Sequence, residues 1–147
     1  MKRILYLSAI AIAISCNTEQ PKQVSSDLQT AILETDKPEK VDLTNFSEED
    51  VARYTIASIM EQPSKRIKVR VENELYYVSY VRKSDSKKFD YKIKINGNTI
   101  VWANIGGRWR DSEYDERLSF EESDNKLKII QTFSDGSVDS KEYKKGE

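Results

Sequence analysis

The sequence predicts an α+β domain in which one N-terminal helix packs on a twisted antiparallel meander of about six or seven strands. Three observations predict this fold. Apolar residues recur with the helical period behind Ser47, and the period changes to two after Pro63. The strand-like segments that follow are joined by short turns, whereas parallel strands need crossovers of about a dozen residues or more. An antiparallel meander is therefore the arrangement that the chain can make.

The predicted helix has a well-defined start and end. Ser47 is a good N-cap, and Asp50 stands three residues later, where a capping box places its acceptor. Phe46 and Val51 have the spacing of a hydrophobic staple, which fixes the direction in which the chain enters the helix. The helix should end near residues 61–62, since a proline follows and disfavours helical geometry before it.

The strands are predicted where β-branched and aromatic residues alternate with polar ones. They cover residues 67–71, 75–81, 89–95, 99–104, 118–120, 127–133 and 137–143. Asn96-Gly97 is a strong signal for a two-residue hairpin turn. Because one helix cannot cover both faces of such a sheet, we expect the sheet to curl around it. This architecture resembles cystatin-like folds or a partly closed barrel, and the analogy implies no function.

Composition excludes several classes of function. The chain has 147 residues, enough for one domain, and its 24 Lys+Arg against 25 Asp+Glu give a net charge of −1. The chain as a whole carries no net positive charge that would attract nucleic acid, so we expect no nucleic-acid partner. The chain has no histidine and one cysteine, which excludes Ser-His-Asp and Cys-His catalysis, histidine or cysteine metal sites and an intramolecular disulfide. We therefore expect no enzyme activity, no cofactor and no metal.

Residues 1–15 have the order of a secretory signal, with a basic start, an apolar stretch at 4–14 and a small residue before Cys16. As a helix, this stretch spans about half of a bilayer core. Ile12–Cys16 resembles the lipobox of bacterial lipoproteins, in which signal peptidase II cuts before the cysteine and a diacylglycerol thioether anchors the new N-terminus. The resemblance implies a membrane anchor at Cys16 in the cell envelope. It favours the outer membrane, since Asn17 is not the Asp that retains enterobacterial lipoproteins in the inner membrane.

Residues 16–45 are expected to form the lipidated N-terminus and a flexible tether. From Asn17 to Asn45 the chain is polar, contains two prolines and has no aromatic residue. Such a segment buries too little apolar surface to offset its ordering entropy. A short helix behind Ser26 is the alternative for part of it. The globular domain is then expected to cover residues 46–147.

The string Gly106–Asp111 is the most unusual local sequence in the chain. On a strand, alternation places Trp109 on one face and both Arg108 and Arg110 on the other, where two guanidiniums clamp a carboxylate or phosphate. The alternative is a glycine bend, with Trp109 filling the core and the arginines paired with carboxylates at residues 111–115. Both possibilities place Trp109 apart from the arginines.

Aromatic residues are concentrated in the second and third predicted strands. Alternation sends Tyr76 and Tyr80 to one face and Tyr77 to the other. An exposed pair beside Trp102 or Trp109 is typical of protein-binding surfaces, since tyrosine offers a large amphipathic area at low entropy cost. Cross-strand packing that stabilises the sheet is the alternative. The candidate binding residues are therefore Arg108, Trp109, Arg110, Tyr76, Tyr80 and Trp102.

Charge is divided unevenly along the chain. Residues 64–94 contain ten Lys/Arg and four Asp/Glu, whereas residues 111–142 contain four and ten. Mutual pairing across the sheet is the explanation we favour, and a bipolar molecule that docks on charged partners is the alternative.

The expected function is that of a cell-envelope lipoprotein whose domain is a non-enzymatic protein-binding or inhibitor module, with an envelope protein as its partner. The alternative is a carrier that holds a small apolar or anionic ligand in a pocket between helix and sheet. The sequence does not fix the oligomeric state.

Overall fold

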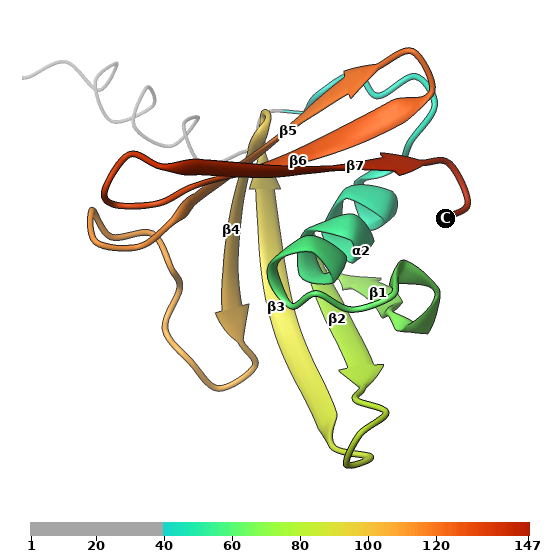
Figure 1. Cartoon of the computed structure of the whole chain (residues 1–147), viewed down its shortest axis with the longest axis vertical. Helices are drawn as coiled ribbons and strands as arrows, with labels where there is room; N and C mark the ends of the chain where they lie inside the picture. Colours follow the sequence, from blue (N-terminus) through green and yellow to red (C-terminus); the bar gives the residue numbers. More distant parts are fainter. Residues whose placement is uncertain (1–39) are drawn as a thin grey trace, which may run out of the picture. The chain divides into compact units, whose positions relative to one another are not determined.

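The computed structural model describes residues 40–147, and Figure 1 shows their arrangement. The predicted signal peptide, Cys16 and residues 17–39 of the predicted tether lie outside the described residues. The described part contains one α-helix and one short 3₁₀ helix followed by seven strands. These elements are α2 (Glu48–Ile59), η1 (Ser64–Arg66), β1 (Lys68–Glu72), β2 (Leu75–Val81), β3 (Lys88–Asn96), β4 (Thr99–Asn104), β5 (Arg117–Ser123), β6 (Lys126–Thr132) and β7 (Val138–Lys144).

The seven strands form one antiparallel sheet in which every strand pairs with its neighbours in the sequence. The structure thus confirms an α+β fold with a meander. β1 and β7 are not neighbours, so the sheet is not closed into a barrel, and of the two expected forms it takes the one that curls around the helix. The physical reason is the position of α2, which contacts β1 and β2 at one end of the sheet and β6 and β7 at the other.

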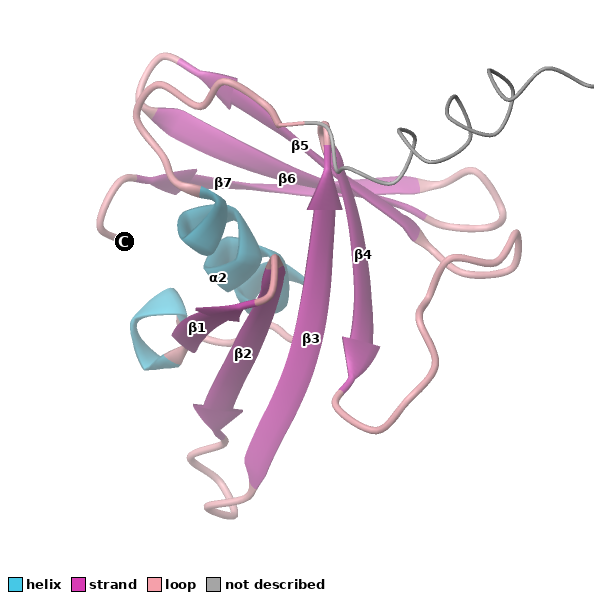
Figure 2. Cartoon of the chain, turned by 180° about the vertical axis from the view of Figure 1, so that it is seen from behind, coloured by secondary structure: helices cyan, strands magenta, loops and turns pink. Residues whose placement is uncertain are grey.

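The sheet bends so that both of its ends reach the helix. Figures 1 and 2 show β5, β6 and β7 running across the direction of β1 to β4, with α2 in the space between the two halves. The side chains that face this space are almost completely buried, and each apolar one contributes roughly 1.5–3 kcal/mol of burial. The most deeply buried include Val51, Tyr54, Ile56, Val78, Ile93, Leu118, Phe120, Leu127 and Ile129.

The start of α2 follows the sequence prediction. Ser47 accepts a hydrogen bond from the Asp50 backbone N–H, and Asp50 accepts one from the Ser47 backbone N–H, which completes the capping box. The predicted staple residues Phe46 and Val51 are both in the core. The helix ends two residues earlier than predicted, at Ile59.

A Schellman motif explains the earlier end of α2. Glu61 has a left-handed backbone with φ of 51°, which reverses the chain. The Gln62 N–H then donates to the Ala57 carbonyl at 3.1 Å, and the Glu61 N–H donates to the Ser58 carbonyl at 3.3 Å. The Ala57 and Ser58 carbonyls are thus satisfied before Pro63 is reached.

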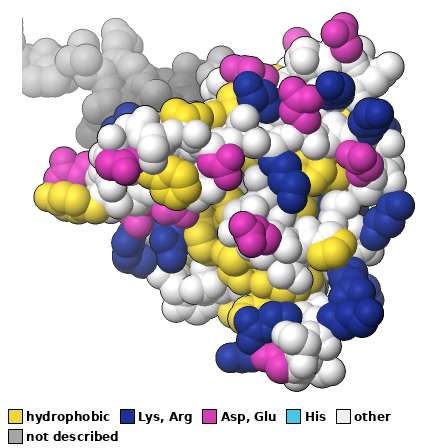
Figure 3. Space-filling view, viewed as in Figure 1, with side chains coloured by type: hydrophobic (Ala, Val, Ile, Leu, Met, Phe, Trp, Pro, Cys, Tyr) yellow, Lys and Arg dark blue, Asp and Glu magenta, His cyan; other side chains and the backbone are white. Residues whose placement is uncertain are grey.

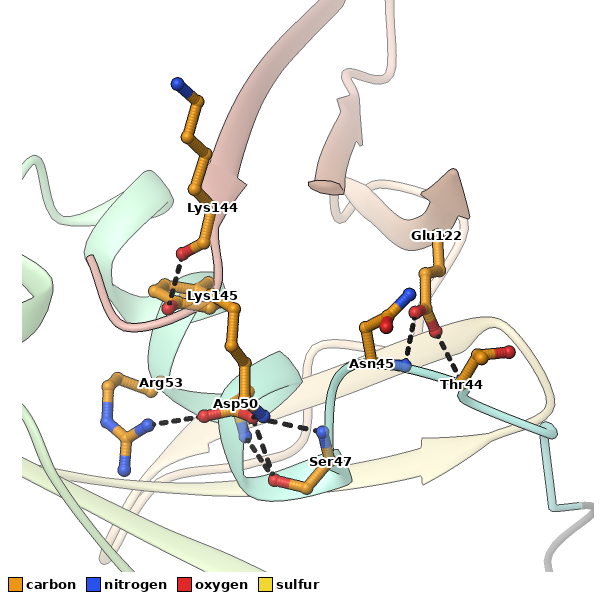
Figure 4. Close-up of polar contacts among 9 residues, drawn as sticks. Thr44, Asn45, Ser47, Asp50, Arg53, Glu122, Lys144 and Lys145 are labelled. Carbon is orange, nitrogen blue, oxygen red and sulfur yellow. Dashed lines mark hydrogen bonds and ion pairs between the residues drawn. The ribbon is translucent and has the colours of Figure 1, made fainter. Parts of the chain in front are cut away.

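Asp50 ties the beginning of the helix to the C-terminal end of the chain (Figure 4). Its carboxylate pairs with Arg53 at 2.7 Å and with Lys145, which follows β7. Four residues along the helix, the Tyr54 hydroxyl donates to the Lys144 carbonyl at 3.0 Å. Burial alone raises the pKa of Asp50, but hydrogen bonds from Lys145 and Ser47 outweigh it and hold the pKa below 3.8.

Residues 41–45, which the sequence assigned to the tether, pack with the domain. Val41 and Leu43 lie against the core. Glu122 at the end of β5 accepts hydrogen bonds from the backbone N–H groups of Thr44, at 2.9 Å, and Asn45, at 2.6 Å (Figure 4). Local sequence patterns do not indicate this contact, because its partners are more than 70 residues apart.

The lowered pKa of Asp50 predicts how stability depends on pH. Since the folded-state pKa lies below the unfolded one, the ionised carboxylate stabilises the fold above pH 3.8, and this contribution is lost as pH falls through the folded pKa. In Asp50→Asn, the free energy of unfolding measured by urea titration should be lower at neutral pH and should fall less between neutral and acidic pH. Asp139→Asn, at an exposed strand position, should keep the wild-type pH profile. Equal profiles for wild type and Asp50→Asn would contradict this role.

Candidate functional site

The connection between β4 and β5, residues 105–116, is the longest in the described region and will be called the β4–β5 loop. It exists because β4 and β5 pair at only two positions, Thr99 with Ser119 and Ile100 with Leu118, and then separate. The loop closes part of the opening, since the Arg110 N–H donates to the Trp102 carbonyl at 3.0 Å. Arg108, Trp109 and Arg110 therefore lie in a loop, so of the two possibilities that the sequence left open, the placement on a strand is wrong.

Arg108 holds the loop in a closed shape. Its guanidinium donates two hydrogen bonds to the Asp115 carboxylate, at 2.7 and 2.8 Å, and the Ser112 hydroxyl donates a third at 2.6 Å. The Asp115 side chain is buried, and the Arg108 guanidinium, followed by Ser112, holds the pKa of Asp115 well below its usual range. The two guanidinium N–H groups of Arg108 that a bidentate anion clamp would use are thus already bound to Asp115.

Trp102 and Arg110 form a second contact across the loop. The Trp102 indole N–H donates to Glu116 at 2.9 Å, and the Arg110 guanidinium lies 4.4 Å above the centre of the Trp102 ring. Arg110 also approaches Glu116, at 3.5 Å. Trp102 is only 5% exposed, so it anchors the loop from below and is not available to a partner. The structure therefore shows the alternative in which both arginines pair with carboxylates.

The exposed part of the site contains Trp109, Tyr114 and two lysines of β3. Trp109 is half-buried and does not fill the core as the bend hypothesis expected. The ammonium groups of Lys92 and Lys94 lie 4.7 and 4.4 Å from the centre of its ring. Tyr114 is 81% exposed, the most exposed large hydrophobic side chain of the described region. Sequence reasoning missed Tyr114, because its neighbours are acidic or small and no alternation points to it.

Tyr76 and Tyr80 are buried in the core, so the expected exposed tyrosine pair is wrong. Their exposed fractions are 8% and 6%. The Tyr76 hydroxyl donates to Glu48 at the start of α2, and burial together with this carboxylate raises the pKa of Tyr76 far above its usual value. Tyr80 stacks on Phe89 at 5.2 Å and on Tyr91 at 6.1 Å between ring centres, which is the cross-strand packing alternative.

A groove with a volume of about 610 Å³ lies beside the loop, between β4 and β5. Its lining combines the charged side chains of Arg110, Glu113 and Arg117 with the edges of Ile100 and Leu118. The space between α2 and the sheet is different, because side chains such as Val51, at 0% exposure, fill it. None of the four grooves found among residues 40–147 that we consider has a lining residue from α2.

Searches for related proteins found no match to a family model, a curated protein or a solved structure. Among residues 40–147, no helix is both long and apolar enough to cross a membrane. In the same part of the chain, no three His, Cys, Asp or Glu residues are grouped so that they would hold a metal ion.

The two tryptophans should differ in their contribution to stability. Trp102→Phe removes a buried indole and its hydrogen bond to Glu116, so the free energy of unfolding should fall by about 2 kcal/mol or more. Trp109→Phe is the matched control and should cost less than about 1 kcal/mol, because the ring is half-exposed. Urea titration followed by circular dichroism measures both values. An equal loss in the two variants would show that Trp102 does not anchor the loop.

Proposed function

We propose that the protein is a membrane-anchored lipoprotein of the cell envelope whose folded domain is a non-enzymatic module that binds a protein partner. The observation that carries the proposal is the β4–β5 loop, which is held in one shape by Arg108 and Trp102 while it exposes Tyr114 and part of Trp109. Such a loop loses little conformational entropy when it binds a partner.

The chemistry of the exposed loop suits a protein surface. Tyrosine and tryptophan are enriched among the residues that dominate binding energy at interfaces. Tyr114 offers a whole aromatic side chain, and Trp109 offers part of a ring next to two ammonium groups. The adjoining groove between β4 and β5 gives a partner side chain a place beside the loop. The helix-on-meander architecture is cystatin-like in outline, which we use as a description of form and not as support for a function.

The anchor part of the proposal is supported by the lipobox-like residues Ile12–Cys16. Acyl chains on Cys16 would hold the domain at the membrane, since each buried CH₂ contributes about 0.8 kcal/mol and more than one chain makes attachment stable. Asn17 after the cysteine favours the outer membrane.

Intact mass spectrometry of the protein from native membranes tests the anchor. The expected mass is that of a chain beginning at Cys16 plus a diacylglyceryl group and acyl chains. Cys16→Ser should lose the added mass and the membrane fraction together. An unmodified cysteine in a secreted chain would contradict the anchor and would leave the binding module untouched.

Site-specific photocrosslinking in intact cells tests the binding surface. A photoreactive phenylalanine analogue at Tyr114 should crosslink to one envelope protein, and Trp109→Ala should reduce the yield severalfold because it removes the other partly exposed aromatic side chain of the same loop. The same analogue at Val71, which is 45% exposed on β1, is the matched control and should not give that product. The same product from both positions, or none from Tyr114, would contradict the proposal.

A further inference from the structure

A second groove lies beside the turn that joins β2 to β3, and it will be called the basic groove. Its volume is about 510 Å³. Six of its lining residues are cationic and none is acidic; they are Lys65, Arg66, Lys68, Arg82, Lys83 and Lys88. Figure 3 shows Lys and Arg side chains gathered at this lower end of the molecule, next to an area of apolar surface. The groove is therefore a region of concentrated positive charge on a chain whose net charge is −1.

Most of these cations have no carboxylate partner among residues 40–147. Arg82 pairs with Asp85 at 2.6 Å, and Lys88 pairs with Asp90 at 2.8 Å. The other four, Lys65, Arg66, Lys68 and Lys83, form no ion pair within the described part of the chain. Pairing across the sheet, the explanation favoured from the sequence, thus does not account for the positive charge at this end.

The shape of the groove favours an extended anionic surface over one small anion. The cations come from η1, the start of β1, the turn after β2 and the start of β3, and all of them are exposed side chains. The β2–β3 hairpin, which carries Arg82, Lys83 and Lys88, extends beyond α2 (Figures 1 and 2), so these three exposed cations are open to a flat partner. Val81, 50% exposed, places an apolar side chain among the charges.

We propose that the basic groove docks on the anionic phospholipid headgroups of a bilayer. Lysine and arginine side chains are attracted to the negative surface potential of such a bilayer, and an aliphatic side chain between them is favoured at the boundary between headgroups and acyl chains. Docking would hold this end of the domain against the membrane. The inference does not rest on the lipid anchor, because the groove is built from residues of the folded domain.

Vesicle binding of the full chain carrying Cys16→Ser tests the proposal without an acyl anchor. The vesicles contain phosphatidylcholine alone or with about one quarter phosphatidylglycerol, and the difference between them removes any contribution of the apolar residues 4–14. Lys65→Gln, Arg66→Gln and Lys83→Gln together should weaken binding to the anionic vesicles about tenfold or more. Lys126→Gln, Lys141→Gln and Lys144→Gln together remove the same charge from β6 and β7 and should leave binding almost unchanged.

The remaining outcomes each support or overturn the inference. Weaker binding at high ionic strength supports it, since exposed charges are screened. Equal loss in both triple variants would overturn it, because net charge and not the groove would then decide binding. If the protein did not bind the anionic vesicles at all, the inference would also be overturned. Groove-dependent binding to immobilised polyglutamate without binding to the vesicles would also overturn it and would assign the groove to an acidic protein. None of these results bears on acylation of Cys16 or on crosslinking from Tyr114.

Discussion

The rest of the structure depends on one constraint, which is that a single short helix must cover the apolar face of a seven-stranded sheet. α2 has 12 residues and is about 18 Å long and about 10–12 Å wide. Seven strands about 4.8 Å apart form a flat sheet about 29 Å wide, more than twice the width of the helix. The sheet meets the constraint by bending, so that β1 and β2 reach the helix from one side and β6 and β7 from the other.

The bend explains where the candidate site lies. β4 and β5 keep only two paired positions at the bend, and the β4–β5 loop covers part of the opening. Trp102 links β4 to this loop, because its ring packs beneath Arg110 and its N–H donates to Glu116. The loop is consequently tied to the core at its base and closed by Arg108 and Asp115 above it. Tyr114 and Trp109 lie in this loop, which covers part of the opening that forms where the sheet bends around α2.

Local sequence was sufficient to predict most elements. Capping by Ser47 and Asp50 and the alternation of the strands depend on residues close together in the chain, and the structure confirms both. The hairpin signal at Asn96-Gly97 was displaced by one residue, since Asn96 pairs with Thr99 and the turn is formed by Gly97 and Asn98. A period of two identifies the residues that share a face and the approximate strand limits.

The candidate site depends on contacts that local patterns do not show. Alternation placed Tyr76 and Tyr80 on the same face, but only the position of α2 decides that this face is buried. The loop conformation at Arg108 arises because the chain folds back to a carboxylate seven residues later. The burial of this face and the conformation of the loop both depend on tertiary contacts, which the periodicity of the sequence does not predict.

Residue-resolved amide hydrogen exchange of the unmodified protein tests the central claim, which is that the β4–β5 loop is held against β4 where the sheet bends. The Arg110 amide, bound to the Trp102 carbonyl, should exchange about a hundredfold or more slowly than a free amide. The neighbouring amide of Asp111 lies at an exposed position and should exchange close to the free rate. An Arg110 amide that exchanges as fast as that of Asp111 would contradict the account, because the loop would then be detached from β4.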